Sequence, residues 1–459
     1  MTNTKNLQKN NIPVKKISFL FIVLLAANHS FAQDTTAKNF SLKEAIEFAL
    51  ANNSTVLNAQ LDVNITALKK KEIRGMGLPQ ISGSFDVKNY VELPTQLLPG
   101  EVFGGPPGTF IPVKFGTKYN ATGGIQASQL IFNSDYIVAI QSSKTATELS
   151  QKNYERTRIE TITLVSKAYY SVLVNKERLK LVYANMERIK KLLDDTKILY
   201  ANGFVEKIDV DRITVTHNNV LSEKEKVERL VAVTESLLKF QMGLDLNIRI
   251  VLTDSLQIDN IPSPDLMTSD KFDYKSRIEY SLLLSQQKLN EFDLKRNMLS
   301  YMPGILLYGN LSAQAQRNEF DILDTDKKWY PIGIVGANVT MPIFSGGQKQ
   351  YRIQQSKLNL LKTMNTLNNL ENAIDLDIQV AKTSYLNAIT TLNIQKINTE
   401  LAEGIFDAVK KKYEQGVGSN LEVLIAETSL KEAQTYYYNA LYEYYIAKID
   451  YDKANGTIK

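Results

Sequence analysis

Residues 344–413 read FSGGQKQYRIQQSKLNLLKTMNTLNNLENAIDLDIQVAKTSYLNAITTLNIQKINTELAEGIFDAVKKKY, without a proline. Apolar side chains recur three or four positions apart in this stretch, which is the spacing of one face of an amphipathic helix. Roughly 65 helical residues at about 1.5 Å each form a rod on the order of 100 Å long, too long for a compact globular domain. The stretch is therefore predicted to span a distance. The residues on this face are Leu360, Met364, Leu367, Ile374, Ile378, Ala381, Tyr385, Ala388, Leu392, Ala402, Phe406, Val409 and Tyr413, with Glu371, Gln395 and Thr399 as polar interruptions.

A second proline-free stretch, from Phe132 to Tyr200, predicts a second rod. Its apolar face is less continuous, because Arg158 falls on it and a 3–3 step near Leu179 indicates a stammer in a coiled coil. Each rod is followed by glycine, the residue that most easily takes the left-handed conformation at a helix end. A shorter return helix should follow each turn. The four predicted helices are 133–201 and 206–243, then 347–414 and 419–455.

The two halves of the chain have similar sequences. Three segments of the first half resemble segments of the second at offsets of 212 to 215 residues, and this near-constant order indicates an internal repeat. The matching pairs are Gln129–Asn133 with Met341–Ser345, Lys167–Tyr170 with Lys382–Tyr385, and Tyr200–Val205 with Tyr413–Gly418. The predicted division is a first repeat at 33–245, a linker at 246–273 and a second repeat at 274–459, with each repeat opening on a helix, at about 41–74 and 274–300.

Each repeat also contains two extended segments. Apolar and polar side chains alternate along the first and third, which is the pattern of half-buried strands. A stretch rich in proline and glycine joins the first pair, and a polar stretch from Arg317 to Lys328 joins the second, so both are predicted to be exposed loops. The predicted strands are about 79–92, 117–131, 303–316 and 331–343.

Two architectures fit these four strands. One is a small soluble sheet. The other is a membrane β-barrel. It is favoured by the export signal at the N-terminus, described next, and by Trp329 and Tyr330 at a strand start, where interfacial aromatic residues belong. Four strands cannot enclose an open lumen, so closure of a barrel would require several chains. The predicted fold class is mainly α, with long coiled-coil hairpins and four strands per chain.

The N-terminus predicts export. Lysines precede a short apolar run from Ile17 to Ala27, and small residues at Ser30 and Ala32 lead to Gln33. This is the pattern of a secretory signal peptide, residues 1–32, cleaved between Ala32 and Gln33. The alternative is a membrane anchor, but the run is shorter than the about 20 residues that a spanning helix needs.

The composition excludes several classes of protein. Removal of residues 1–32 lowers the formal net charge from +5 to about +1, so nucleic acid is not an expected partner. The chain has no cysteine and, after cleavage, one histidine, His217, which excludes disulfides, thiol chemistry and two-histidine metal sites. Acidic pairs such as Asp194 with Asp195 lack the companions of a calcium site. No nucleophile elbow, phosphate loop or zinc-binding helix is present, so we expect no enzyme, no cofactor and no metal.

Two motifs resemble the TolC-like outer-membrane efflux family. Residues 341–347, MPIFSGG, look like the strand-to-helix junction of the family, at Pro342, Phe344, Gly346 and Gly347. Residues 413–424, YEQGVGSNLEVL, look like its periplasmic tip. The resemblance covers essentially the whole mature chain, although the first-half copies of both motifs have diverged.

The resemblance implies a channel in the outer membrane with a large periplasmic portion. In this family, three chains contribute four strands each to one 12-stranded barrel in the lipid, and the helices form a hollow cylinder. The tips meet a periplasmic membrane-fusion adaptor, which joins the channel to an inner-membrane pump in tripartite efflux or type I secretion. The implied docking residues are Gly203, Phe204 and Val205 at one tip and Gly416, Val417, Gly418 and Ser419 at the other. The sequence does not reveal the cargo.

The family also implies an acidic constriction just after the tips. Asp209 and Glu422 stand at these positions, and six such carboxylates in a trimer would repel one another unless a cation neutralised them. A second family acid is absent, because Ile425 and Arg212 occupy its places; Arg212 could contact Asp209 at i,i+3 instead. Without the resemblance, both acids fit a solvated helix start, where the macrodipole favours them.

The competing function is a periplasmic coiled-coil adaptor or scaffold without its own pore. Adaptors usually carry a single helical hairpin between small β-rich domains. This chain has two hairpins and no such domains, so the channel is the favoured interpretation.

Overall fold

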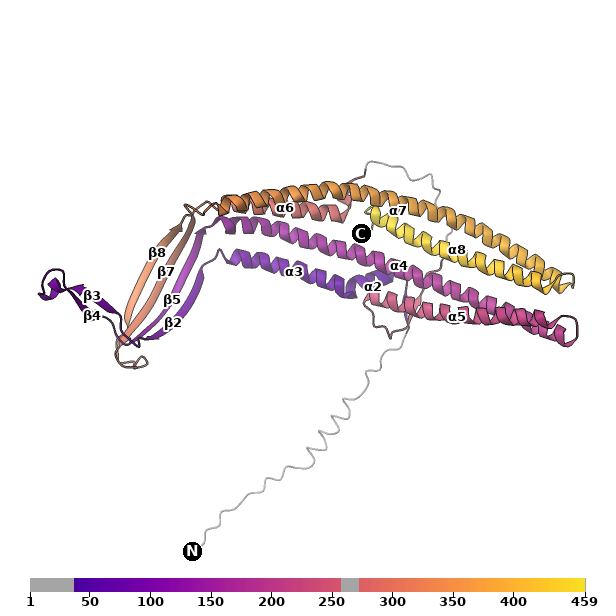
Figure 1. Cartoon of the computed structure of the whole chain (residues 1–459), viewed down its shortest axis with the longest axis horizontal. Helices are drawn as coiled ribbons and strands as arrows, with labels where there is room; N and C mark the ends of the chain where they lie inside the picture. The colour runs from indigo at the N-terminus through magenta and orange to yellow at the C-terminus, as the bar shows by residue number, and fades with distance from the viewer. Residues whose placement is uncertain (1–36, 257–271, 459) are drawn as a thin grey trace, which may run out of the picture.

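The computed structural model describes residues 37–256 and 272–458. The predicted signal peptide with its cleavage point at Ala32 and Gln33, and part of the predicted linker, lie outside these residues. The molecule is elongated, with a sheet at one end, two helical turns at the other and long helices between them (Figure 1). Within the described residues, no helix is both long enough and apolar enough to cross a membrane.

Two helices run nearly the whole length of the helical part. They are α4, Ser134–Ala201, and α7, Gln348–Glu414, of 68 and 67 residues. Neither contains a proline, so no backbone N–H is missing from the ladder of hydrogen bonds along either rod. At about 1.5 Å per residue each is on the order of 100 Å long. Their length sets the length of the molecule.

Shorter helices complete a second layer beside each rod. Near the sheet α3, Ser54–Gly75, packs on α4, and α6, Ile278–Leu299, packs between α4 and α7. Towards the tips α5, Lys207–Met242, packs on α4, and α8, Asn420–Ala454, packs between α4 and α7. The helices therefore form a row four across, with α7 at one edge and α3 and α5 at the other (Figure 1).

The short and return helices meet end to end, and both halves of the chain make the same junction. In the first half, Asn53 caps α3 and its side-chain amide donates to the carbonyl of Gln241, at the end of α5, over 2.8 Å. In the second half, Arg277 precedes α6 and its Nη1 donates to the carbonyl of Ala454, the last residue of α8, over 2.9 Å. Carbonyls at a helix end have no partner within the helix, so each side chain satisfies one of them.

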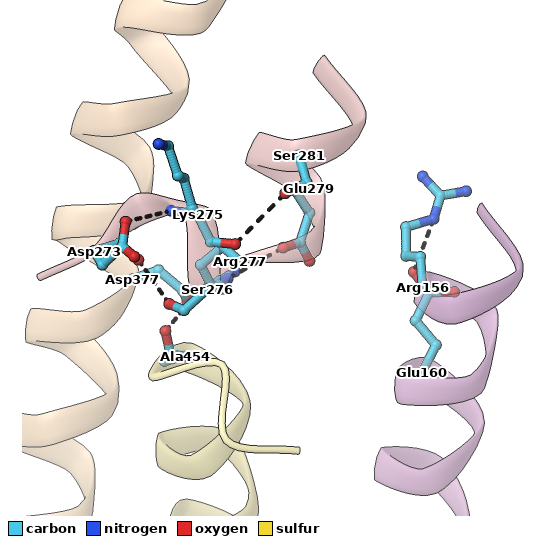
Figure 2. A network of polar contacts seen from close by, with 10 residues as sticks. All are labelled: Arg156, Glu160, Asp273, Lys275, Ser276, Arg277, Glu279, Ser281, Asp377 and Ala454. Atoms are coloured by element: carbon cyan, nitrogen blue, oxygen red, sulfur yellow. Dashed lines mark hydrogen bonds and ion pairs between the residues drawn. The ribbon is translucent and has the colours of Figure 1, made fainter. Parts of the chain in front are cut away.

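Arg277 is a buried point of attachment for three helices (Figure 2). Its guanidinium contacts Glu279 at the start of α6 over 3.1 Å and Asp377 in the middle of α7 over 2.9 Å, besides the carbonyl of Ala454. Burial opposes the charge, but the hydrogen bonds to Asp377 and Glu279 raise the pKa of the guanidinium above its ordinary value. A buried charge with three partners is satisfied.

The single helix predicted at about 41–74 is wrong. The chain forms α2, Leu42–Asn52, and then α3, because Asn53 takes an extended backbone conformation between them. Ser41 and Glu44 form a capping box that starts α2, and the amide oxygen of Asn53 accepts from the backbone N–H of Thr55 to start α3. The break turns the buried side of α2 onto α4.

A pair of short parallel strands, β1 (Lys38–Phe40) and β6 (Ile250–Leu252), lies beside α2 and was not expected from the sequence. The Tyr169 hydroxyl on α4 donates to the Phe40 carbonyl and to Asp254, each over 2.9 Å. Burial and the bond to Asp254 raise the pKa of Tyr169 well above its usual range. The Tyr169 hydroxyl thus joins α4 to β1 and to the segment that follows β6.

The main sheet is antiparallel, in the order β2-β5-β7-β8. The loop predicted between its first two strands instead contains a separate hairpin, β3 and β4, with a 3-10 turn, η1 (Gly100–Phe103), at its tip. The main strands are β2 at Gln80–Asn89, β5 at Tyr119–Phe132, β7 at Gly304–Arg317 and β8 at Tyr330–Thr340; the hairpin strands are β3 at Thr95–Pro99 and β4 at Phe110–Lys114.

The junctions between helix ends predict two sensitive glycines. Gly243 and Gly456 have φ of +70° and +68°, and a Cβ on them would lie 2.6 Å from the Asn52 carbonyl oxygen and 2.7 Å from that of Ser276. We expect Gly243→Ala and Gly456→Ala each to lower the free energy of unfolding by more than about 1 kcal/mol. Thermal unfolding followed by circular dichroism measures this.

The matched control is Gly404→Ala on the exposed side of α7, where a Cβ meets open space. That substitution should raise helix stability by about 0.5–1 kcal/mol. Equal unfolding temperatures for the Gly456 and Gly404 variants would contradict the importance of the junction.

Candidate functional site

The two helical turns at the end far from the sheet have the same backbone geometry. In the first, the N–H of Phe204 donates to the Leu199 carbonyl over 2.9 Å around Gly203, whose φ is +80°. In the second, the N–H of Val417 donates to the Lys412 carbonyl over 3.0 Å around Gly416, whose φ is +77°. Both are Schellman motifs, which require a left-handed residue and so explain the glycines.

Each tip presents one large apolar side chain to solvent. Phe204 is 77% exposed and Val417 is 76% exposed. Val205 is half-buried, Ser419 caps α8, and a Cβ at Gly418 would lie 2.9 Å from the Tyr413 nitrogen. The predicted tip residues therefore divide into those that make the turn and two that stand out from it.

Asp209 and Glu422 occupy the same position of the two return helices. Each is the third residue after the cap of its helix, which is Glu206 for α5 and Ser419 for α8. Asp209 accepts from the backbone N–H of Glu206 over 3.3 Å, while Glu422 is exposed. Only Asp209 completes a capping box, whereas the helix dipole favours an acid at both positions.

The positions one turn later differ between the halves. Arg212 lies with Nη1 3.9 Å from Asp209 Oδ1, so the first-half acid has a cation beside it. In the second half Ile425 is exposed next to Glu422 and lines an apolar groove of about 490 Å³ with Leu401 and Ile405. The two acids therefore have different surroundings in one chain.

An ion pair between the two helical pairs was missed from the sequence. Arg188 on α4 donates through Nε to both carboxylate oxygens of Glu427 on α8, over 2.9 and 3.0 Å, and Glu427 is only 3% exposed. The guanidinium carbon also lies 5.6 Å from the centre of the Phe406 ring on α7. A signal existed, because Glu427 falls four residues after Val423 and three before Leu430 on the buried face of α8.

A second buried polar contact lies nearer the tips. The Asn420 amide donates to the hydroxyl of Thr196 over 3.2 Å, and both residues are buried. Polar contacts also join the two helices of the first pair, as between Arg178 on α4 and Glu223 on α5, whose atoms lie 2.7 Å apart. Polar side chains therefore contribute both to the α4–α8 boundary and to the α4–α5 contact.

The strand-to-helix junctions are built differently in the two halves. β5 ends at Phe132 and Asn133 caps α4 directly, accepting from the N–H of Tyr136 over 3.0 Å. β8 ends at Thr340, rather than at the predicted 343, and α7 begins only at Gln348. Between them Pro342 is half-buried, Phe344 is 90% exposed, and Gly346 and Gly347 have φ of +58° and +79°.

The predicted interface aromatics lie at the end of the sheet farthest from the helices. Trp329 is half-buried, with its ring 6.4 Å from that of Phe85 on β2, and Tyr330 is exposed. Trp329 also packs against a small core formed by Ala121, Ala315 and Ile322. In the β7–β8 connection, the hydrogen bond from Lys327 lowers the pKa of Asp321.

The described residues contain no group of three or more histidines, cysteines, aspartates or glutamates that could hold a metal ion. The acids at the tips and the buried Glu427 are thus placed for electrostatic and structural contacts.

Known proteins resemble this chain over most of its length. A family model described as outer membrane efflux protein matches residues 45–244 and 297–457. Outer membrane protein TolC of Escherichia coli is 23% identical over 359 residues, which is 75% of this chain and 71% of TolC. The adaptor or scaffold alternative is excluded by these similarities, and so is an enzyme.

Solved structures show the same fold. The Campylobacter jejuni CmeC outer membrane channel superposes with a TM-score of 0.71 at 17% identity, covering 90% of this chain and 85% of CmeC. The open state of the Neisseria gonorrhoeae MtrE outer membrane channel gives 0.69 at 15% identity, covering 90% and 88%. The chain belongs to the outer membrane efflux protein family and forms a TolC-like efflux channel of the outer membrane, with a periplasmic portion.

Proposed function

We propose that three copies of this chain close a 12-stranded barrel, and that this barrel is the exit of an efflux or type I secretion duct. The observation that carries the proposal is the main sheet, whose outer strands β2 and β8 each have one unpaired edge. Unpaired strand edges cannot be left in lipid, and pairing β8 of one copy with β2 of the next removes all of them.

The two faces of the sheet support the same assembly. The strand register places apolar side chains of all four strands on one face and mostly polar side chains on the other. Outward apolar and inward polar residues are the pattern of a transmembrane barrel around an aqueous lumen. The apolar face carries Ile81, Phe85, Val87, Ile125, Leu307, Leu311, Val335 and Val339; the polar face carries Ser82, Ser84, Asp86, Thr122, Gln126, Asn310, Ser312 and Gln314.

The helical row also has uncovered apolar side chains at both edges. Contiguous exposed apolar patches of this length mark interaction surfaces. Joining the α7 edge of one copy to the α3 and α5 edge of the next would cover them and close the helices into a cylinder. The exposed residues are Leu57, Leu61, Ile65 and Leu68 on α3, Val215, Val233, Leu237 and Phe240 on α5, and Leu358, Leu361, Leu376, Val380, Ile394, Ile397, Leu401 and Ile405 on α7.

The tips are proposed to meet a periplasmic adaptor, and through it an inner-membrane pump. Support comes from the two matched turns, each of which presents one exposed apolar residue at the far end of the molecule. Just inside the tips, Asp209 and Glu422 of three copies would place six carboxylates around the axis. Trp329 and Tyr330 would lie at the membrane boundary at the opposite end.

Adjacent residues of β8 test the barrel. Val335 is 92% exposed on the apolar face, and Ile334 lies on the polar face. Val335→Arg should cost about 2–4 kcal/mol if that face meets the bilayer midplane, and so reduce the amount of trimer in outer membranes. Ile334→Arg, facing an aqueous lumen, should assemble normally. Quantifying trimer by native electrophoresis of membrane extracts checks both; equal assembly of the two variants contradicts the assigned faces.

The acidic constriction predicts a block by cations. Six carboxylates close together should bind a divalent cation, which lowers their mutual repulsion. Channels in planar bilayers should therefore lose conductance when magnesium is added, and Asp209→Asn combined with Glu422→Gln should abolish the block while keeping side-chain size. Asp211→Asn, an exposed acid on the same helix, is the matched control. A block that survives the double substitution would remove both acids from the constriction.

The docking role of the tips can be tested by placing charged side chains on them. Phe204→Asp with Val417→Asp changes two side chains that stand out from the turns, so trimers should form while adaptor-dependent export is lost. Leu323→Asp, at an apolar site that is 88% exposed at the opposite end, is the control and should export normally. Export at the wild-type rate by the tip variant would reject docking at these residues.

A further inference from the structure

The β3–β4 hairpin projects beyond the end of the sheet, on the side away from the helices (Figure 1). Its two strands pair only with each other, through five residues each, from Thr95 opposite Lys114 to Pro99 opposite Phe110. In an outer-membrane channel with periplasmic helices, this end faces the cell surface. A two-stranded hairpin alone is at best marginally stable in water.

The composition of the hairpin is unusual for a surface element. From Leu93 to Val113 the only charged side chain is that of Glu101. Large apolar side chains on both strands and at the tip have no cover within the chain. Apolar surface concentrated in this way marks a surface that another molecule covers. The exposed residues are Leu97, Val102, Phe103, Phe110 and Ile111.

The position of the hairpin in the sheet indicates what covers it. It is inserted between β2, an edge strand, and β5, so each copy would raise one hairpin from the barrel wall at a point repeated by three-fold symmetry. Twelve strands about 4.8 Å apart and tilted by about 40° place the wall roughly 12 Å from the axis. The six residues from Pro94 to Pro99, which precede the 3-10 turn at the tip, reach about 20 Å when extended at about 3.3 Å per residue. The hairpin is therefore long enough to reach the axis and its two symmetry mates.

We propose that the β3–β4 hairpins of three copies converge over the outer mouth of the channel and pack their apolar side chains against one another. This inference rests on the trimeric barrel proposed above. The apolar surface of each hairpin is then covered by the same hairpin of the two neighbouring copies. The cluster of three hairpins restricts the exit at the cell surface. A constriction of apolar side chains impedes ions by excluding water.

The absence of native cysteine allows a direct test. In Phe103→Cys, the new thiol lies at the hairpin tip and would meet its own copies near the axis. Mild oxidation of purified trimers in lipid nanodiscs should produce disulfide-linked dimers, leaving one chain of each trimer unlinked. Leu323→Cys, which is 88% exposed on the other outer connection, is the control and should stay unlinked.

Native mass spectrometry of the same samples separates the two levels of the proposal. Monomers without cross-links would reject the trimeric barrel. Intact trimers without the Phe103→Cys disulfide would reject convergence alone, and quenching of a dye on that thiol by spin-labelled lipid would then place the hairpin in the membrane. As a second measurement, changing Leu97, Val102, Phe103 and Phe110 together to serine should raise single-channel conductance; unchanged conductance would overturn the restriction of the exit.

Discussion

The architecture depends on the bond that joins one helix end to the next. A side chain at the start of a short helix, Asn53 or Arg277, donates to a terminal carbonyl of a return helix, and Gly243 or Gly456 lets the two backbones approach. Both halves of the chain make this junction. In each half, a short helix and a return helix placed end to end therefore match the length of one long rod, although the two are not consecutive in the chain. The layer beside each rod is then unbroken from the sheet to the tips.

Much of this fold was predictable from the sequence because long-range order arises from local periodicity. The spacing of Tyr385, Ala388 and Leu392 already predicts one buried face of α7, and all three are buried. The break at Asn53, the β1–β6 pair and the β3–β4 hairpin were not predictable in the same way. The break at Asn53 and the β1–β6 pair depend on partners far along the chain, such as Gln241 for Asn53. The β3–β4 strands lie close in sequence, but the prolines and glycines around them are typical of a loop.

The tips and the buried ion pair show the same limit on what the sequence predicts about the functional site. Glycine at Gly203 and Gly416 predicts a left-handed helix end from residue type alone, and both have positive φ. The pairing of Arg188 with Glu427 joins residues 239 positions apart, so the sequence gives only a hint, an acid on an apolar face. The roles of Asp209 and Glu422 in a constriction are proposals, since the helix dipole favours an acid at both positions and a capping box accounts for Asp209.

The unequal strand-to-helix junctions have a mechanical consequence. Asn133 alone separates β5 from α4, so bending or rotation of that rod is transmitted stiffly to the sheet. Residues 341–347, with two left-handed glycines, form a compliant coupling between β8 and α7. The other two strands of each chain join α3 and α6 through connections of intermediate length, residues 76–79 and 300–303. In a closed ring of three chains, the direct β5–α4 joint would recur three times and hold the helical cylinder to the wall of the barrel.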